Sequence, residues 1–177
     1  MGLIATLLYG TGMRLLEGLH LRVKDIEFER REIVVRGGKG GKDRITVLPE
    51  NLILPLQADL AKVKALRGHD IDTGCDEASV ANRVEQKYPK EACTWGWRFV
   101  FHAAVRSLDA QSGIERRYHI YGSSVQRAVR EAAKHAGIQK PVTPHILHTL
   151  LPRNCFRLAT IFAPYRSCWG TLMLPPR

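Results

Sequence analysis

Two apolar helical stretches separated by glycines constrain the fold of this chain more than any other feature of its sequence. Apolar side chains dominate residues 3–9, Gly10 and Gly12 break the run, and leucines return at helical spacing from Leu15. Glycine weakens a continuous helix and allows a sharp change of direction. The sequence therefore predicts one helix over 3–9 and a second over 14–21.

Arg14 stands at the start of the second predicted helix. A glycine-flanked helix start lets the backbone approach an anion, and an arginine there adds a planar, permanently charged group suited to phosphate. Glu17 follows three residues later on the same helix face, where its carboxylate can hold the guanidinium. Taken alone, the pair favours an ordinary ion pair on the surface, because short motifs have low specificity, and a phosphate-binding arginine is the alternative.

The charge balance of the chain indicates its class of partner. The chain has 177 residues, of which 45% are hydrophobic, and this predicts one globular domain with a sizeable core. A net charge of +10 favours a polyanion, with nucleic acid ahead of a membrane because no long apolar run or amphipathic anchor stands out. The four cysteines have neither metal-ligand nor disulfide spacing, so we expect reduced thiols, a cytoplasmic protein and no metal.

A glycine-rich turn between two apolar segments predicts a β-hairpin. Residues 32–36 and 44–48 alternate in the way typical of strands, and residues 37–43 between them contain four glycines and two lysines. The turn is not a P-loop, because no glycine stands four residues before a Gly-Lys-Ser/Thr sequence. Its alternative interpretation is a flexible, solvated basic turn.

The rest of the chain is predicted to be mainly helical. The fold class is therefore mainly α with a small antiparallel β-hairpin sheet (α+β). The predicted elements are helices over 49–66, 77–88 and 123–135, a polar loop over 68–74, and an aromatic segment over 95–101 with a short strand.

Three features stand in order along the chain: Arg14 with Glu17, the turn Gly-Lys-Gly-Gly-Lys-Asp-Arg at 38–44, and Thr-Pro-His at 143–145. Together they resemble the catalytic domain of tyrosine recombinases of the phage integrase family. Further motifs are Leu-Leu-Tyr-Gly-Thr-Gly-Met-Arg at 7–14, Leu-Arg-Val-Lys-Asp at 21–25, Lys-Tyr-Pro at 87–89, Trp-Gly-Trp at 95–97, and Ala-Gly-Ile-Gln-Lys-Pro at 136–141. These resemble, more narrowly, an integron integrase. The resemblance covers residues 3–147, and the segment 77–102 resembles the helical insertion that separates integron integrases from other members.

The resemblance implies cleavage of a DNA strand by a tyrosine, through a 3′-phosphotyrosyl bond and without metal or cofactor. It matches Arg14 to the first phosphate-clamping arginine, with Glu17 as its support. It matches Lys39 to the lysine that protonates the leaving 5′-oxygen, and His145 to the histidine of a His-x-x-Arg box. The chemistry requires such groups, because the transition state needs cations and the leaving oxygen needs an acid.

The resemblance also implies DNA as the partner, including recombination sites that are folded single-stranded hairpins, and tetramers assembled on DNA. Aromatic and histidine side chains suit stacking against the extrahelical bases of such sites, and packing in the core is their alternative role. The candidate phosphate contacts are Arg36, Lys42 and Arg44, and the candidate stacking residues are Trp95, Trp97 and His119.

The sequence departs from the family pattern near its end. His148 stands where the second arginine of the box is expected, and Tyr165 lacks the surroundings of the nucleophilic tyrosine. Residues 149–177 contain no acidic residue and several prolines, so we expect a poorly ordered tail after a partial catalytic domain over 1–148. A shifted frame of codons for this tail resembles the missing family segment. We therefore hypothesise a single-base deletion near the codons for residues 147–149, which sequencing of the DNA tests.

The beginning of the chain is also expected to be incomplete. Residues 3–9 start abruptly without a helix cap, and the family carries a separate helical domain before this point. The leading hypothesis is a truncated, inactive recombinase catalytic domain with no matched nucleophile. The alternatives are a non-catalytic basic DNA-binding remnant and a pseudogene product that does not fold stably.

Overall fold

The computed structural model describes residues 1–73, 94–109 and 113–149, except for the side chains of Lys39 and residues 147–149. The predicted helix 77–88, most of the predicted insertion and the predicted tail after Thr149 lie outside the described residues. The chain divides into two compact units. The first unit consists of residues 1–18 and 122–177, and the second of residues 19–121. No described helix is long and apolar enough to span a membrane.

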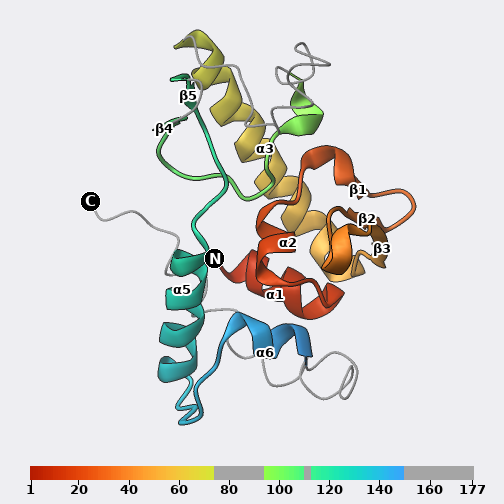
Figure 1. Ribbon diagram of the computed structural model, residues 1–177, viewed down its shortest axis with the longest axis vertical. Helices are drawn as coiled ribbons and strands as arrows, with labels where there is room; N and C mark the ends of the chain where they lie inside the picture. The colour runs from red at the N-terminus through yellow and green to blue at the C-terminus, as the bar shows by residue number, and fades with distance from the viewer. Residues whose placement is uncertain (74–93, 110–112, 150–177) are drawn as a thin grey trace. The chain divides into compact units, whose positions relative to one another are not determined.

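The described part of the first unit contains the helices α1 (Gly2–Thr11), α5 (Gly122–His135) and α6 (Pro144–Thr149) and most of the short helix α2 (Leu15–Leu19) (Figure 1). The α6 helix packs against α1 and α5. The α1 helix ends where Gly12 adopts a left-handed conformation with φ of 65° and donates its N–H to Leu8 O at 3.1 Å. On α5, the buried Val125, Val129 and Ala133 recur every fourth residue and form its apolar face.

The second unit is built on a three-stranded antiparallel sheet with the order β1-β2-β3. The predicted hairpin is confirmed, because β2 pairs with β3 up to Val35 opposite Arg44. Ile33 and Val35 are buried on one face of β2, as the alternation predicts. The elements that follow α2 are η1 (Val23–Asp25), β1 (Ile26–Glu27), β2 (Glu32–Val35), η2 (Lys39–Gly41) and β3 (Arg44–Val47).

The long helix α3 (Glu50–Asp72) follows the sheet and corrects the prediction of a polar loop over 68–74. Leu52, Leu56, Leu60 and Val63 recur at helical spacing and form its buried apolar face. The helix continues past the predicted end because Asp70, in its last turn, is buried in an ion pair that the local sequence does not reveal.

The segment after the first gap, which spans residues 74–93, also differs from the prediction. Residues 95–101 hold the 3-10 turn η4 (Trp95–Trp97) and an isolated bridge between Phe99 and Arg22, where a short strand was predicted. A two-stranded sheet of β4 (Ser107–Leu108) and β5 (Glu115–Arg116) was not predicted, because strands of two residues carry no alternation. The fold class, mainly helical with a small antiparallel sheet, is confirmed.

Candidate functional site

Arg14 and Glu17 form a local cluster at the start of α2. The carboxylate of Glu17 accepts the Arg14 backbone N–H at 2.8 Å through Oε2 and the Arg14 Nη1 at 3.0 Å through Oε1. The Glu17 side chain is 8% exposed, whereas that of Arg14 is 43% exposed. A nearly buried carboxylate therefore caps the helix and orients the guanidinium, while much of the arginine still faces solvent.

Gly18 brings the first two helices close together. A Cβ added at Gly18 would lie 2.6 Å from Cδ2 of Leu8, which is fully buried. The Gly18 N–H also donates to Arg14 O at 3.0 Å. The absence of a side chain thus supports the position of the Arg14 backbone. Sequence reasoning missed this residue, although an isolated glycine inside a helical repeat is a signal for close packing.

His145 lies in the same unit as Arg14, on the exposed side of the short helix α6. The Thr143 O accepts the Ile146 N–H at 3.0 Å at the start of this helix, and Pro144 is buried. The α6 helix packs against α1, the helix that leads into Arg14. His148 also belongs to α6, but its side chain lies outside the described residues, so its role stays a prediction.

The glycine-rich turn of the second unit carries Lys39 and Lys42. Lys39 begins the 3-10 turn η2, and Lys42 is exposed where the chain returns towards β3. Arg44 is half-buried at the start of β3. Arg36 is 55% exposed, and its guanidinium pairs with Asp25 at 2.6 Å and with Asp43 at 3.5 Å. The turn is therefore basic at its surface and tied by carboxylates at its base.

Cations cover one of the two candidate tryptophans. The Lys24 Nζ lies 2.8 Å from the centroid of the Trp97 ring, and the Arg22 guanidinium lies 5.2 Å from it. Arg22 also donates a hydrogen bond to Trp97 O. Burial lowers the pKa of Arg22 below its usual value, and Asp25 partly opposes that shift. Trp95 is half-buried in the same turn. Cation–π contacts of this kind fix the position of the Trp97 ring.

His119 belongs to a cluster of three rings. Its ring lies edge-on to Phe99 at 5.2 Å and to His20 at 4.7 Å between centroids. Phe99 is 6% exposed, so one side of His119 is part of the core. Burial is the main cause that lowers the pKa of His20, followed by the charges of His119 and Arg22. These contacts agree with the packing alternative and leave base stacking as a prediction.

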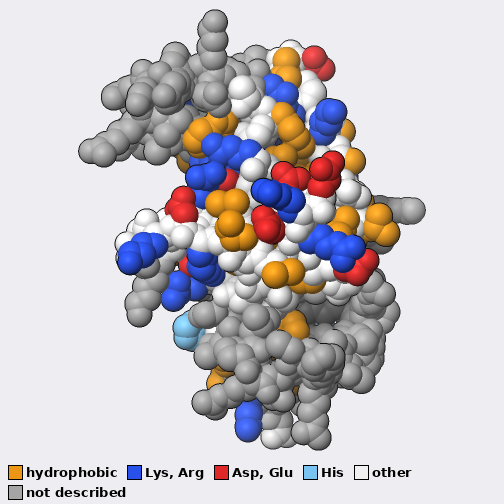
Figure 2. Space-filling view, turned by 90° about the vertical axis from the view of Figure 1, so that its right-hand side faces the viewer, with side chains coloured by type: hydrophobic (Ala, Val, Ile, Leu, Met, Phe, Trp, Pro, Cys, Tyr) orange, Lys and Arg blue, Asp and Glu red, His pale blue; other side chains and the backbone are white. Residues whose placement is uncertain are grey.

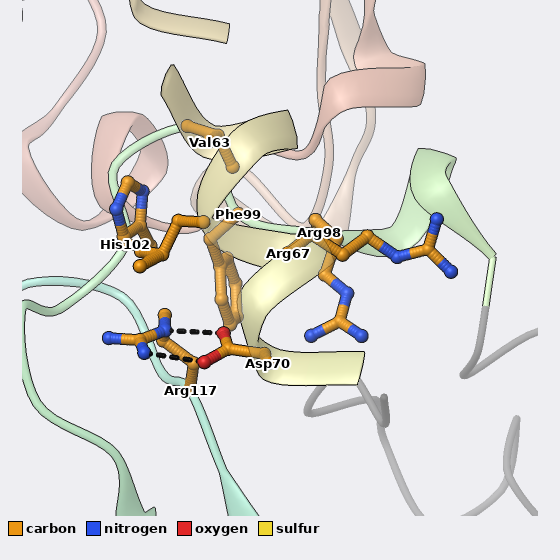
Figure 3. Close-up of a pocket in the computed structure, with 8 residues that line it drawn as sticks. Val63, Arg67, Asp70, Arg98, Phe99, His102 and Arg117 are labelled. Carbon is orange, nitrogen blue, oxygen red and sulfur yellow. Dashed lines mark hydrogen bonds and ion pairs between the residues drawn. The ribbon is translucent and has the colours of Figure 1, made fainter. Parts of the chain in front are cut away.

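A buried ion pair joins α3 to the segment after the second gap (Figure 3). Arg117 donates from Nε to Asp70 Oδ2 and from Nη2 to Asp70 Oδ1, each at 2.7 Å. Its Nη1 donates to the carbonyl oxygens of Ala103 at 3.0 Å and Ala104 at 2.6 Å. Arg106 adds a longer contact to Asp70 at 3.9 Å. The hydrogen bond from Arg117 is the main cause that lowers the pKa of Asp70.

The cavity beside this pair is small. Its volume of about 20 Å³ is close to the space that one water molecule needs. Burial is the main cause that lowers the pKa of His102, and the charge of Arg117 adds to it. The cavity therefore suits a buried polar network better than an organic ligand. It is lined by Val63, Leu66, Arg67, Asp70, Arg98, Phe99, His102 and Arg117.

The described surface mixes charges of both signs. Figure 2 shows Lys and Arg side chains interspersed with Asp and Glu on the face that it displays. The net charge of +10 is therefore not gathered into one unbroken basic patch on the described part of that face. Within residues 1–73, 94–109 and 113–149, no group of three or more His, Cys, Asp or Glu is placed to hold a metal ion.

The chain is similar to integrases and recombinases over most of its length. The model of the phage integrase family matches residues 2–151. An Escherichia coli protein named integrase/recombinase is 43% identical over 163 residues, which cover 90% of this chain and 48% of that protein. The chain thus spans about half the length of the curated relatives it matches.

Tyrosine recombinase XerA is a second similar protein. The sequence from Pyrococcus furiosus is 49% identical over 55 residues, which cover 31% of this chain and 19% of that protein. A crystal structure of XerA recombinase matches with a TM-score of 0.52 and 24% identity, covering 90% of this chain and 45% of that one. At this identity the likeness between the two structures supports the fold alone.

Proposed function

We propose a function in DNA recombination from one premise: the chain belongs to the phage integrase family. Its similarity to tyrosine recombinases covers most of the chain, and its net charge of +10 suits a DNA partner. In this proposal the chain is part of a site-specific tyrosine recombinase of the bacterial cytoplasm, and it binds DNA around the phosphate where the family acts. Assembly into tetramers on DNA belongs to the same proposal.

The observation that carries the proposal is the geometry of Arg14. One of its guanidinium nitrogens is held at 3.0 Å by the nearly buried Glu17, and 43% of its side chain stays exposed. An arginine fixed at one nitrogen and open at the others can bind a phosphate oxygen without losing much side-chain entropy. The same guanidinium would oppose the negative charge that develops at phosphorus during strand transfer.

Strand cleavage itself requires more groups than Arg14. In the family reaction a tyrosine oxygen bonds to phosphorus, the bond to the 5′-oxygen breaks, and that oxygen takes a proton, which we assign to Lys39. His148 replaces the second arginine, and no tyrosine of the printed sequence matches the nucleophile. A neutral imidazole cannot supply the charge of a guanidinium. We therefore propose that this chain binds DNA without completing cleavage.

A nicked DNA substrate that traps the covalent intermediate tests the absence of cleavage. We expect no protein–DNA adduct after incubation of the full chain with such a substrate, as judged by denaturing electrophoresis. An adduct that disappears in the Tyr165→Phe variant would overturn this part of the proposal, because it would identify a working nucleophile.

The phosphate-binding role of Arg14 is tested by the salt dependence of DNA affinity. Replacing Arg14 by Gln should weaken binding and reduce the slope of log K against log salt by about one, since one phosphate contact is lost. Arg127→Gln is the matched control, because Arg127 is exposed on α5 of the same unit. Equal slopes for the two variants would show that Arg14 makes no phosphate contact.

A folded single-stranded hairpin is the second candidate substrate, as expected for an integron integrase. The supporting observation is the clustering of aromatic rings at η4 and around His119. Trp95 offers the better stacking surface, because Lys24 already lies over the Trp97 ring. Trp95→Ala should therefore weaken binding to hairpins with extrahelical bases by about tenfold and leave a fully paired duplex unaffected. Equal losses on both DNAs would contradict this substrate.

A further inference from the structure

One carboxylate, that of Asp43, closes the base of the glycine-rich turn. We call this base, formed by Arg36, Gly37 and Asp43, the neck of the turn. Arg36 is the first residue after β2, and Asp43 is the last residue before β3. Asp43 Oδ1 accepts the Gly37 N–H at 2.9 Å, and Asp43 Oδ2 lies 3.5 Å from Arg36 Nη1. The two contacts join the strands directly beyond the last pair of the sheet, Val35 and Arg44. Asp43 thus closes the turn at the point where the backbone ladder ends.

Arg36 connects this neck to the interior of the second unit. Its Nε donates to Asp25 Oδ1 at 2.6 Å, and Asp25 is only 3% exposed. A buried carboxylate is stable only when a partner compensates its charge. The hydrogen bond that Arg36 donates to Asp25 is the main cause that raises the pKa of Arg36 above its usual value. The guanidinium therefore bridges a buried carboxylate on η1 and an exposed carboxylate at the neck.

The turn itself is shaped by its backbone and not by packing. Gly37, Gly40 and Gly41 have φ angles of 60°, 78° and 72°, which favour glycine. A Cβ added at any of these three glycines would meet no atom within 4 Å. Inside the turn, Gly38 N–H donates to Lys42 O at 3.0 Å. Because open space surrounds these glycines, the contacts at the neck set the direction of the turn.

We propose that Arg36 is a positioning residue and not a phosphate contact: the chain Asp25–Arg36–Asp43 aims the turn that carries Lys39 and Lys42 at DNA. The inference rests on the proposed function, which supplies the DNA. It changes the role predicted for Arg36 from its charge alone, since its guanidinium already pairs with two carboxylates. In this role Arg36 must be an arginine, because its guanidinium contacts both carboxylates at once. The single ammonium group of a lysine cannot replace it.

Amide hydrogen exchange of the free full chain tests the neck. Asp43→Asn should speed the exchange of residues 37–43 by about threefold to fivefold, as expected for the loss of an exposed ion pair. Arg36→Lys keeps the charge but cannot reach both carboxylates, so it should have at least the same effect. Glu29→Gln is the matched control, because Glu29 is exposed in the β1–β2 turn and its replacement changes the net charge equally.

Thermal unfolding of Asp43→Asn separates positioning from general stability. The midpoint should match that of Glu29→Gln while exchange of residues 37–43 is faster. Unchanged exchange of residues 37–43 in both Asp43→Asn and Arg36→Lys would contradict the inference that these contacts hold the turn. A lowered midpoint with uniformly faster exchange would also overturn the inference, because Asp43 would then stabilise the whole unit.

Acylation of Lys39 in the presence of duplex DNA tests the aim of the turn. Bound DNA should protect Lys39 in the wild-type chain and protect it at least twofold less in Asp43→Asn, with unchanged protection in Glu29→Gln. Equal protection in both variants would overturn the positioning role. If the wild-type chain binds no DNA, the proposed function is wrong, and so is the inference that the turn is directed at DNA. The hydrogen-exchange result would still show whether the contacts at the neck hold the turn.

Discussion

Two arginine–carboxylate pairs of this chain differ in nearly every physical respect. Arg14 and Glu17 are three residues apart, meet through one guanidinium nitrogen, and leave the arginine 43% exposed. Arg117 and Asp70 are 47 residues apart, meet through two hydrogen bonds of 2.7 Å, and are 10% and 4% exposed. The first pair is local and open, and the second is distant in sequence and buried.

The difference shows which pair is suited to a ligand. All three guanidinium nitrogens of Arg117 donate to oxygen atoms of the protein itself. These hydrogen bonds therefore hold α3 against the segment that carries Arg117. Arg14 uses one nitrogen, and its exposed remainder faces solvent. A buried bidentate pair serves the structure, whereas an oriented and exposed arginine is available to bind phosphate.

The largest expected effect comes from breaking the buried pair. Asp70→Asn should lower the free energy of unfolding by about 3–5 kcal/mol, because Arg117 would keep its charge in a buried site without a carboxylate. Asp72→Asn, an exposed change on the same helix, should stay within about 0.5 kcal/mol. Urea unfolding followed by circular dichroism measures both. Equal losses would mean that the Asp70 pair contributes no more than a surface charge.

Gly18 on α2 and Gly68 on α3 should respond in opposite ways to replacement by alanine. Gly18→Ala should destabilise the chain by about 1–3 kcal/mol, because the new Cβ would lie 2.6 Å from the buried Leu8. Gly68→Ala on α3 should instead stabilise it by about 0.5–1 kcal/mol, since nothing lies within 4 Å and alanine favours a helix. Urea unfolding measures the change in the free energy of unfolding of both variants. A change of the same sign in both would contradict the close packing at Gly18.

The free energy of unfolding should fall in acid, because protonation of Asp70 removes the charge that pairs with Arg117. Arg117 lowers the pKa of Asp70 in the folded state, so its stabilisation is complete above the unfolded value of about 3.9 and is lost as the pH falls through the folded value. The loss should be about 1.4 kcal/mol for each unit between the two pKa values. Unfolding at pH 5, 4, 3 and 2 should therefore show a steeper decline for the wild type than for Asp70→Asn. Parallel curves would show that Asp70 has an ordinary pKa in the folded chain.

The local parts of the fold were predictable from the sequence, and the long-range parts were not. The contact between Arg14 and Glu17 follows from their spacing on one helix, and the β2–β3 hairpin follows from the glycine-rich turn. The pair of Asp70 and Arg117 carries no local signal, so Gly68 and its polar neighbours predicted a loop where α3 continues. Sequence therefore indicated the open pair correctly and missed the buried one.

The candidate site divides in the same way. Charge and motif order selected Arg14, Lys39 and Arg36, but only the structure shows that Arg36 is held between Asp25 and Asp43. The role of Gly18 also depends on the position of Leu8, which a one-dimensional pattern does not give. Residue type thus indicated which groups are suited to phosphate, and distances decided which of them are already engaged by the protein.

The smallest expected effect is the coupling between Arg14 and Glu17, and it tests the comparison most directly. A double-mutant cycle of Arg14→Gln and Glu17→Gln should give a coupling of about 0.2–1 kcal/mol, because the arginine is exposed and solvent screens the pair. Glu17→Ala should cost about 1 kcal/mol, since it also removes the acceptor for the Arg14 backbone N–H. Urea unfolding of the four chains measures the coupling. A value near the loss expected for Asp70→Asn would make Arg14 a structural residue and remove the reason to regard it as open to phosphate.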